Sequence, residues 1–187
     1  MLTALAYDIH VEQLFERMRQ LHALLSAAGV PYRIVGGMAV FMHVFERDPL
    51  RARLTADVDA AIERTHLPDV IAAARKIGWS FRHTAGVDML IDAEQPRARS
   101  AVHILFLNEK VRPEYADAVP SSEAEKTAEG IPVAPVADLV RMKLTSYRLK
   151  DRVHVQDLDS VGLISKEIEA QLPALLLDRL AQIHASE

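Results

Sequence analysis

Two short motifs between Val35 and Ile62 constrain this chain more than any other part of it. The first is Gly36-Gly37, which follows an apolar, strand-like run and precedes a helix-like one. Two glycines at a strand-to-helix corner leave backbone N–H groups free to face an anion, because no Cβ atom blocks the approach. An ordinary tight turn would use the same glycines, so this motif does not decide the function alone.

The second motif is Asp57-Val58-Asp59, in a predicted strand over residues 57–62. Side chains alternate along a strand, so both carboxylates share one face at a separation of ~6.5–7 Å. Their oxygens would then converge on one divalent cation. The alternative is a strand end with two solvated acids. A phosphate cradle beside paired carboxylates favours metal-assisted phosphoryl or nucleotidyl transfer.

This combination resembles the nucleotidyltransferase superfamily, in which an apolar residue and Gly-Gly or Gly-Ser precede Asp-x-Asp on the next strand. Within it, the chain is similar to small bacterial nucleotidyltransferase-like proteins related to the AbiEii toxins. Thr55, two residues before Asp57, fits that pattern, and so does the region from Lys143 to Asp159. The resemblance implies a mixed sheet flanked by helices, a C-terminal helical subdomain, and an active site between them.

The resemblance also implies roles for the residues of both motifs. Asp57 and Asp59 would be catalytic and would hold Mg²⁺, or Mn²⁺ in its place, which bridges a nucleoside triphosphate. Gly36, Gly37 and Thr55 would bind the substrate. Many relatives have Ser at the second glycine position, whereas this chain offers only backbone there.

The chain departs from the family at a third carboxylate, which relatives often supply from a later strand. The corresponding run here is Val102-His103-Ile104. A neutral imidazole is a poor Mg²⁺ ligand, but it would serve as a base, bind the substrate, or suit a softer metal. Asp88 is the other candidate third acid. A structural histidine among apolar neighbours is the alternative for His103.

Lys143 and Asp157 complete the predicted site. Lys143 falls on or beside the apolar stripe of its helix, so it is expected to face the cleft and the β/γ phosphates; the alternative is a lysine that snorkels at the edge of the stripe. Asp157 corresponds by resemblance to a family acid, with Gln156 in place of Arg. It would orient Lys143 or accept the proton of the attacking hydroxyl, unless it only complements a helix dipole.

Periodicity and turn residues predict an α/β half over residues 1–130 and a helical half over residues 131–187. The fold class is thus α/β, of the α+β type. Helices are expected over 11–28, 38–45, 68–77, 136–150, 154–161, 165–172 and from 173 onward; strands over 32–35, 57–62, 79–83, 87–92 and 102–107; loops over 47–53 and 94–100; and a long connector over 108–130.

Composition limits the partners and the cellular compartment that we expect for the protein. The 187 residues carry a net charge of −4, so contact with a polyanion must come from a local basic patch. The absence of cysteine excludes disulfides and thiolate metal sites. Without a transmembrane or leader-like stretch, we expect a cytoplasmic protein with no membrane partner. Oligomeric state is not determined by these features.

The sequence therefore favours an enzyme that moves a nucleoside monophosphate from a nucleoside triphosphate to a hydroxyl on RNA, a protein or a small molecule. By analogy, it would belong to a toxin–antitoxin or phage-defence pair with a cognate antitoxin. Two alternatives stay open. One is a degenerate nucleotide-binding or regulatory module, which His103 in place of an acid favours. The other is a structural partner of another protein, such as an antitoxin.

Overall fold

A computed structural model describes residues 2–55, 57–93 and 101–186, with side chains from residue 11 onward. The strands are β1 (Tyr32–Val35), β2 (Val58–Ile62), β3 (Trp79–Thr84), β4 (Val87–Asp92), β5 (Val102–Phe106), β6 (Glu125–Lys126) and β7 (Pro132–Val133). The helices are α1 (Leu2–Ala27), α2 (Gly36–Arg47), α3 (Leu67–Lys76), α4 (Val136–Ser146), α5 (Leu149–Ser160), α6 (Lys166–Ala170) and α7 (Ala174–His184), with a 3₁₀ turn, η1 (Arg64–His66).

The strands form one mixed, seven-stranded sheet in the order β3-β4-β5-β2-β1-β7-β6. The central pair, β2 and β5, is parallel, while β1 runs antiparallel to β2. The β3–β4 hairpin extends the sheet on one side, and the short β7 and β6 extend it on the other. This order places β2, which carries Asp59, at the centre of the sheet.

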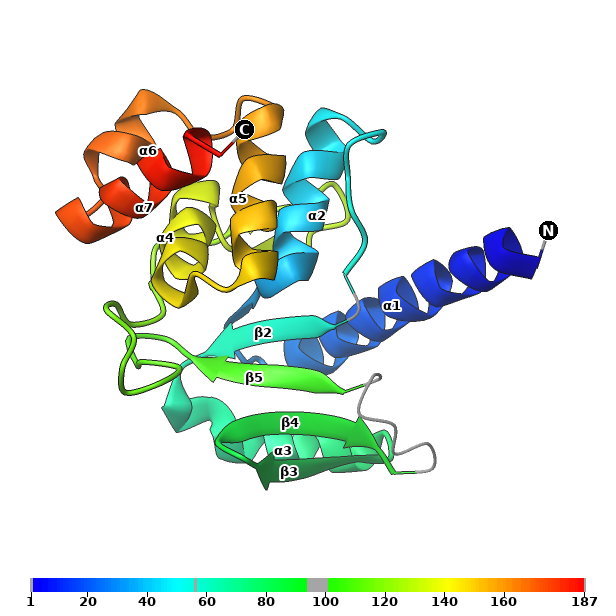
Figure 1. Cartoon of the computed structure of the whole chain (residues 1–187). Coiled ribbons are helices and arrows are strands. Elements are labelled where there is room, and N and C mark those ends of the chain that lie inside the picture. The colour runs from blue at the N-terminus through cyan, green and yellow to red at the C-terminus, as the bar shows by residue number, and fades with distance from the viewer. Residues whose placement is uncertain (1, 56, 94–100, 187) are drawn as a thin grey trace.

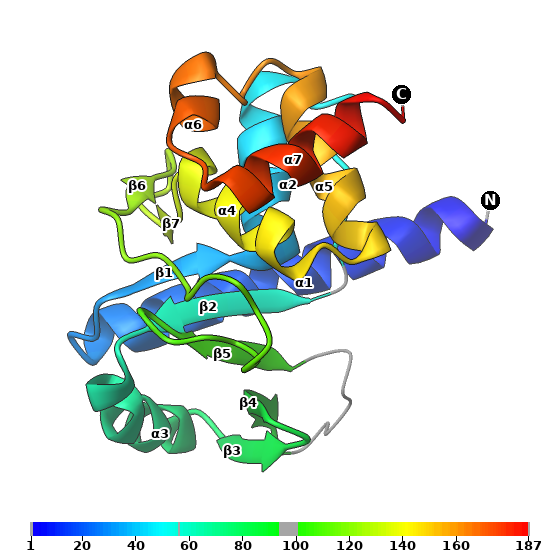
Figure 2. The ribbon, with the colours of Figure 1, turned by 60° about the vertical axis from the view of Figure 1, so that its left-hand side comes forward.

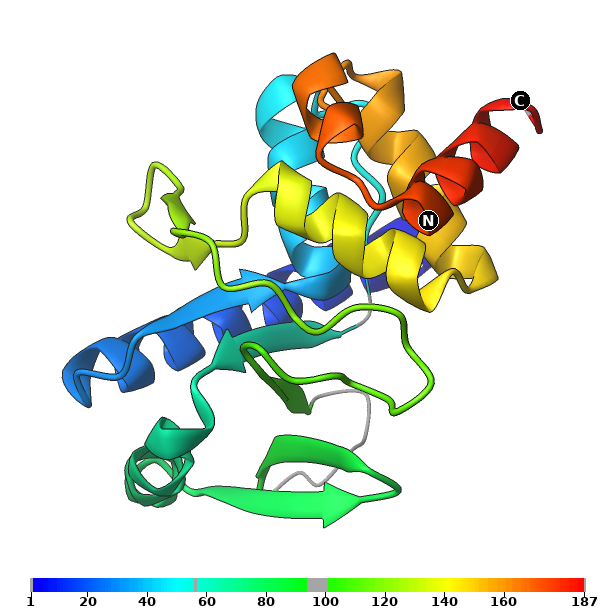
Figure 3. The ribbon, with the colours of Figure 1, turned by 90° about the vertical axis from the view of Figure 1, so that its left-hand side faces the viewer.

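Helices cover the two faces unequally (Figures 1 and 3). α1 and α3 lie on one face, where they contact each other, β2 and β3. On the other face α2 packs on β1 and β2, and α4 and α5 pack on α2. In the described part of the chain no helix covers β3, β4 and β5 on this second face (Figure 2). The helical layer therefore begins at the middle of the sheet and leaves the outer strands open.

Helix α2 is the most enclosed element, with every residue from Gly36 to Val44 buried. It is sandwiched between the sheet and the α4–α5 pair, so apolar side chains suit all its sides. Below the sheet, Met18, Leu21 and Leu25 of α1 are almost fully buried. None of the helices in the described residues has both the length and the apolar character of a membrane span.

These observations confirm the predicted fold class: a mixed sheet flanked by helices, followed by a helical C-terminal part. The division at residue 130 stays a prediction; β7 lies beyond it and pairs in parallel with β1. The predicted loop over residues 94–100 lies outside the described residues. Residue Asp57 immediately precedes β2 and is not its first residue.

The predicted helix over residues 136–150 is wrong at its end. α4 stops at Ser146, because Tyr147 adopts a left-handed conformation with φ of 49° and its N–H caps the carbonyl of Lys143. Left-handed backbone is uncommon for a residue other than glycine. Here the Tyr147 hydroxyl donates to the carbonyl of Arg179, 3.2 Å away, which anchors the corner to α7. The next helix, α5, starts at Leu149 and not at His154.

The β3–β4 turn generates a stability prediction. Ala85 and Gly86 both have positive φ, 52° and 74°, as a two-residue type I′ turn requires. Asparagine tolerates this conformation better than alanine. We expect Ala85→Asn to raise the free energy of unfolding by about 0.5–1 kcal/mol in urea denaturation. Gly86→Ala, the matched control, should lower it; a loss of stability in both variants would contradict the turn geometry.

Candidate active site

The corner between β1 and α2 is built around the close approach of Asp59 to Gly36. Val35, the last residue of β1, pairs in register with Asp59 of β2. Gly36 has φ of +71°, and a Cβ atom there would lie only 1.9 Å from Oδ2 of Asp59. Both the backbone conformation and the space therefore demand glycine. This contact sets one carboxylate directly against the first turn of α2.

Gly37 is equally enclosed. A Cβ atom at this position would lie 2.5 Å from Oγ1 of Thr55 and 3.3 Å from Cε1 of His154 in α5. Val35, the N-cap residue of α2, provides no side-chain hydrogen bond to the free N–H groups of the first turn. A helix N-terminus without such a cap is electropositive and can receive an anion. The corner thus joins two acids, a hydroxyl, an imidazole and uncapped backbone donors.

Asp57, Asp59 and His103 lie together, as the sequence predicts for the first two. Val58 between the acids is buried, while both acids are half-buried. His103 lies opposite Asp59 on β5, and its Nδ1 donates to Oδ1 of Asp59 at 2.9 Å. This hydrogen bond, followed by the charges of Asp59 and Asp57, raises the pKa of His103 despite the opposing effect of burial. The imidazole therefore belongs to the same electrostatic unit as both acids.

Asp88 is not the third acid of this cluster. In the β4–β5 register Met89 pairs with His103, whereas Asp88 pairs with Ile104. Neighbouring residues in a strand point to opposite faces, so Asp88 faces away from His103. Its carboxylate instead accepts a 2.7 Å hydrogen bond from His83. Of these two candidates, only His103 lies beside Asp59.

Lys143 is buried in an ionic cluster between α4 and α5. Only 6% of Lys143 is exposed, and its Nζ donates to Oδ1 of Asp151 at 3.3 Å. Burial lowers the pKa of Lys143, while the charges of Asp151 and Asp59 oppose that effect. The charge of Asp59 is thus close enough to act on the ammonium group of Lys143. The prediction of an inward-facing lysine is consistent with this burial.

Asp151 is the residue that holds the cluster, and the sequence interpretation missed it. It is completely buried and accepts hydrogen bonds from Lys143, Ser146 and Arg148. Burial alone would raise the pKa of Asp151, but the hydrogen bonds and the charge of Lys143 outweigh it and lower the pKa to about 2. Asp151 lies in the first turn of α5 and accepts from the backbone N–H of Arg148, a position that the misplaced helix start concealed.

Asp157 does not orient Lys143. Its Oδ1 lies 2.9 Å from Nε of Arg53, in the loop that precedes β2. Burial raises the pKa of Asp157, with Arg53 opposing the shift. The pair fastens α5 to that loop, so the orienting role passes to Asp151. A role of Asp157 as a base stays a prediction.

Two further residues approach the site: His154 of α5, within the region from Lys143 to Asp159 that the sequence singled out, and Tyr115, which the sequence did not single out. His154 packs on Gly37, and burial, followed by the charge of Lys143, lowers its pKa to about 4. Its Nδ1 is buried and has no hydrogen-bond partner among the residues that the structure describes. Tyr115, on the connector between β5 and β6, lies close enough to Arg148 to influence its pKa. Tyr115 belongs to no recognisable motif, because the fold alone brings it here.

The donor set matches a metal that the substrate helps to bind. No group of three His, Asp or Glu side chains in the described ranges is arranged to hold a metal ion. Mg²⁺ characteristically takes one or two carboxylates and completes its shell with water and substrate phosphates. Asp57 and Asp59 supply two carboxylates, and the absence of a Cβ atom at Gly36 lets the Asp59 carboxylate lie against the first turn of α2. These residues therefore fit Mg²⁺ or Mn²⁺ bound together with a phosphate.

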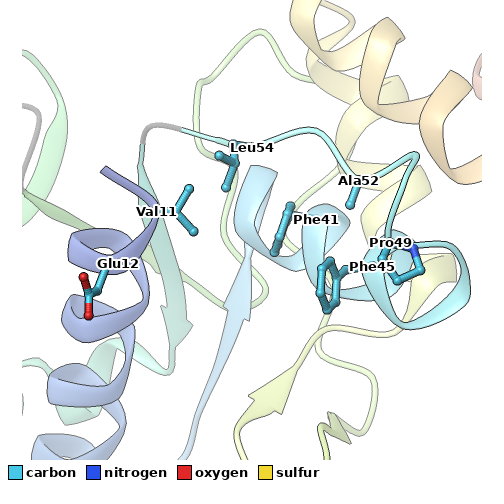
Figure 4. A pocket seen from close by; sticks show the side chains of 7 residues that line it. All are labelled: Val11, Glu12, Phe41, Phe45, Pro49, Ala52 and Leu54. Atoms are coloured by element: carbon cyan, nitrogen blue, oxygen red, sulfur yellow. The ribbon is translucent and has the colours of Figure 1, made fainter. Parts of the chain in front are cut away.

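A separate hollow lies on the other side of α2, between it, α1 and the loop that precedes β2 (Figure 4). Its volume is about 460 Å³, and it is lined by Val11, Glu12, Phe41, Phe45, Pro49, Ala52 and Leu54. The lining is apolar apart from Glu12. None of the predicted catalytic residues lines it, so the hollow is distinct from the acid cluster.

Comparison with known proteins returned structural similarity alone. No family model and no curated protein matches the sequence. The solution structure of the antibiotic-resistance factor ANT(2'')-Ia is similar over 95% of this chain and 85% of that one, with a TM-score of 0.49 and 12% identity. The crystal structure of ANT(2'')-Ia in complex with adenylyl-2''-tobramycin is similar over 90% of this chain and 86% of that one, with a TM-score of 0.44 and 12% identity. The crystal structure of the Megavirus polyadenylate synthase is similar over 94% of this chain and 34% of that one, with a TM-score of 0.42 and 7% identity.

The glycine corner yields a prediction with a matched control. Gly36 and Gly29 have similar positive φ, 71° and 65°, but a Cβ atom at Gly29 would meet nothing within 4 Å. Gly29→Ala should therefore cost only left-handed strain, about 1–2 kcal/mol. Gly36→Ala must also displace Asp59, and we expect a clearly larger loss in urea denaturation. Equal losses in the two variants would contradict the close approach.

The two histidines of the site should have pKa values shifted in opposite directions from the ordinary value. We expect NMR titration of the ring protons to give His103 a pKa above 6.5 and His154 a pKa of about 4. The raised pKa of His103 contributes stability below the unfolded value, which is lost as pH rises through the folded value. The depressed pKa of His154 contributes stability above the unfolded value, which is lost as pH falls towards 4.

Asp59→Asn is the control that separates the effect of the Asp59 charge on His103 from the effect of burial on His154. It should lower the pKa of His103, because it removes the hydrogen-bonded charge. It should leave His154 depressed, since burial is the main cause there. An unchanged His103 titration in this variant would show that the ring does not pair with Asp59.

Proposed function

We propose that this protein is a nucleotidyltransferase that moves a nucleoside monophosphate from a nucleoside triphosphate to a hydroxyl acceptor. The observation that carries the proposal is the contact of Asp59 with Gly36 at the uncapped start of α2. It sets a carboxylate pair beside backbone N–H donors, which are the groups needed to bind a cation and a polyphosphate together.

In this proposal the triphosphate lies between the sheet and the helical layer. Gly36, Gly37 and Thr55 face its oxygens from the β1–α2 corner. Lys143 and Arg148, both held by Asp151, supply positive charge from the helices. Asp57 and Asp59 would hold Mg²⁺ or Mn²⁺, which supplies charge neutralisation on the phosphates when bound. Anionic and cationic groups thus come from opposite layers of the fold.

The transfer itself is an in-line displacement at the α-phosphorus. The acceptor oxygen forms a bond to that phosphorus, the bond to the bridging oxygen breaks, and pyrophosphate leaves. The acceptor proton needs a base. His103 donates through Nδ1 to Asp59, so Nε2 is the ring nitrogen left to take the proton. The ring is 26% exposed, which leaves it accessible to an acceptor.

The finer parts of the proposal rest on the sequence resemblance. RNA, a protein or a small molecule is the candidate acceptor, and a toxin–antitoxin or phage-defence pair with a cognate antitoxin is the candidate setting. The second candidate function is a nucleotide-binding regulatory module without turnover. His103 in the place of a third acid favours it, because the described residues offer only two carboxylates for the cation.

Calorimetric titration with ATP, CTP, GTP and UTP in the presence of Mg²⁺, followed by a pyrophosphate-release assay, tests the proposal. We expect one or more nucleotides to bind. Asp57→Asn and Asp59→Asn should each reduce pyrophosphate release by roughly 100-fold or more, because each removes a charge that acts at the transferred phosphoryl group. Asp69→Asn, an acid on the remote helix α3, is the matched control and should leave release unchanged.

The two candidate functions predict different results. Binding without release across candidate acceptors would favour the regulatory module. Absence of binding for all four nucleotides would contradict both. Equal loss of release in Asp59→Asn and Asp69→Asn would mean that the acid cluster is not the catalytic centre.

A further inference from the structure

A straight row of side chains crosses the outer part of the sheet from the acid cluster. Asp59 pairs in register with His103, His103 with Met89, and Met89 with Arg82. Residues paired in register on adjacent strands present their side chains to the same face. The hydrogen bond between His103 and Asp59 identifies that face as the one that carries the candidate active site. The row therefore leads from the site to the edge of the sheet.

This row is open to an approaching molecule. The helices of the second face stop over β1 and β2, and no helix in the described residues covers β5, β4 or β3 there (Figure 3). His103 and Met89 are half-buried, and Arg82 is exposed. The surface changes along the row from imidazole to thioether to guanidinium, that is, from polar to apolar to cationic.

Arg82 is a free cation at the outer end of the row. Its guanidinium makes no hydrogen bond or ion pair with any residue in the described part of the chain. Its neighbour His83, by contrast, is paired with Asp88 on the opposite face. Arginine recognises carboxylate and phosphate groups through paired N–H donors. Within the described residues, Arg82 is also the only Lys or Arg that β3 and β4 contribute.

From this arrangement we infer that the acceptor is a small hydroxyl compound that carries an anionic group. Its hydroxyl faces His103, its body lies over Met89, and its anionic group pairs with Arg82. Strands are spaced by ~4.8 Å, so His103 and Arg82 are ~10 Å apart across the sheet. Arg82 is the only cation of this row, which suits one anionic group, whereas a polyanion such as RNA needs several cations along its length. The assignment of this compound as an acceptor rests on the proposed function.

Ribose 5-phosphate and ribose, both used as their methyl furanosides, form a suitable probe pair, because they then differ only in the anionic group. Their binding to the whole 187-residue chain is measured by calorimetry, with and without a non-hydrolysable nucleotide and Mg²⁺. Perturbation of the Met89 methyl signal in NMR reports where they bind. We expect ribose 5-phosphate to bind about 10-fold or more tightly than ribose, as a charged hydrogen bond allows, and to shift the Met89 signal.

Arg82→Gln should abolish this preference without changing the affinity for nucleotide. Arg75→Gln removes the same charge from an exposed position on α3, on the opposite face, and should preserve the preference. Equal binding of the two sugars, a preference that survives Arg82→Gln, or an unmoved Met89 signal would overturn the inference. Tighter, Arg82-dependent binding of a short single-stranded RNA would also overturn it, in favour of a nucleic-acid acceptor.

The same samples separate this inference from the proposed function. Nucleotide binding tests only the function, and the sugar pair tests only the surface. If no nucleotide binds but the Arg82-dependent preference persists, the anion-selective surface stands and its assignment as an acceptor site falls.

Discussion

The contact between the Asp59 carboxylate and the α-carbon of Gly36 is the constraint on which the rest of the site depends. It fixes the distance between β2 and the first turn of α2, and so determines where the uncapped N–H groups lie relative to the acids. Burial of α2 from Gly36 to Val44 holds the helix in that position. The apolar core thus serves the site by preventing α2 from sliding along the sheet.

The charges of the site are held by two independent systems. The acids stand on a central strand, whose position is set by the ladders to β1 and β5. The cations stand on α4 and α5, which the buried Asp151 ties together. A buried carboxylate is costly unless it is fully paired, and here three side chains donate to it. The cost is offset locally, so Lys143 keeps its position even though its own pKa is lowered by burial.

The sequence predicted those features that depend on local pattern. Alternation along residues 57–62 and periodicity in the helices identified most elements, and Gly36-Gly37 marked the corner. Features that depend on tertiary context could not be predicted. Tyr147 ends a helix without glycine or proline, because α7 anchors its hydroxyl. In the sequence, Asp151 and Asp157 look alike as helix acids. Only the fold shows that Asp151 pairs with Lys143 and Asp157 with Arg53.

The approach of Asp59 to Gly36 has a consequence for how this chain can diversify. Because the position of Gly36 admits no side chain, this part of the site cannot change by substitution. New substrate preferences must then arise on surfaces where residues can be exchanged freely. The exposed hairpin of β3 and β4 is such a surface, and a lineage could replace its side chains one by one while the reactive centre stays the same.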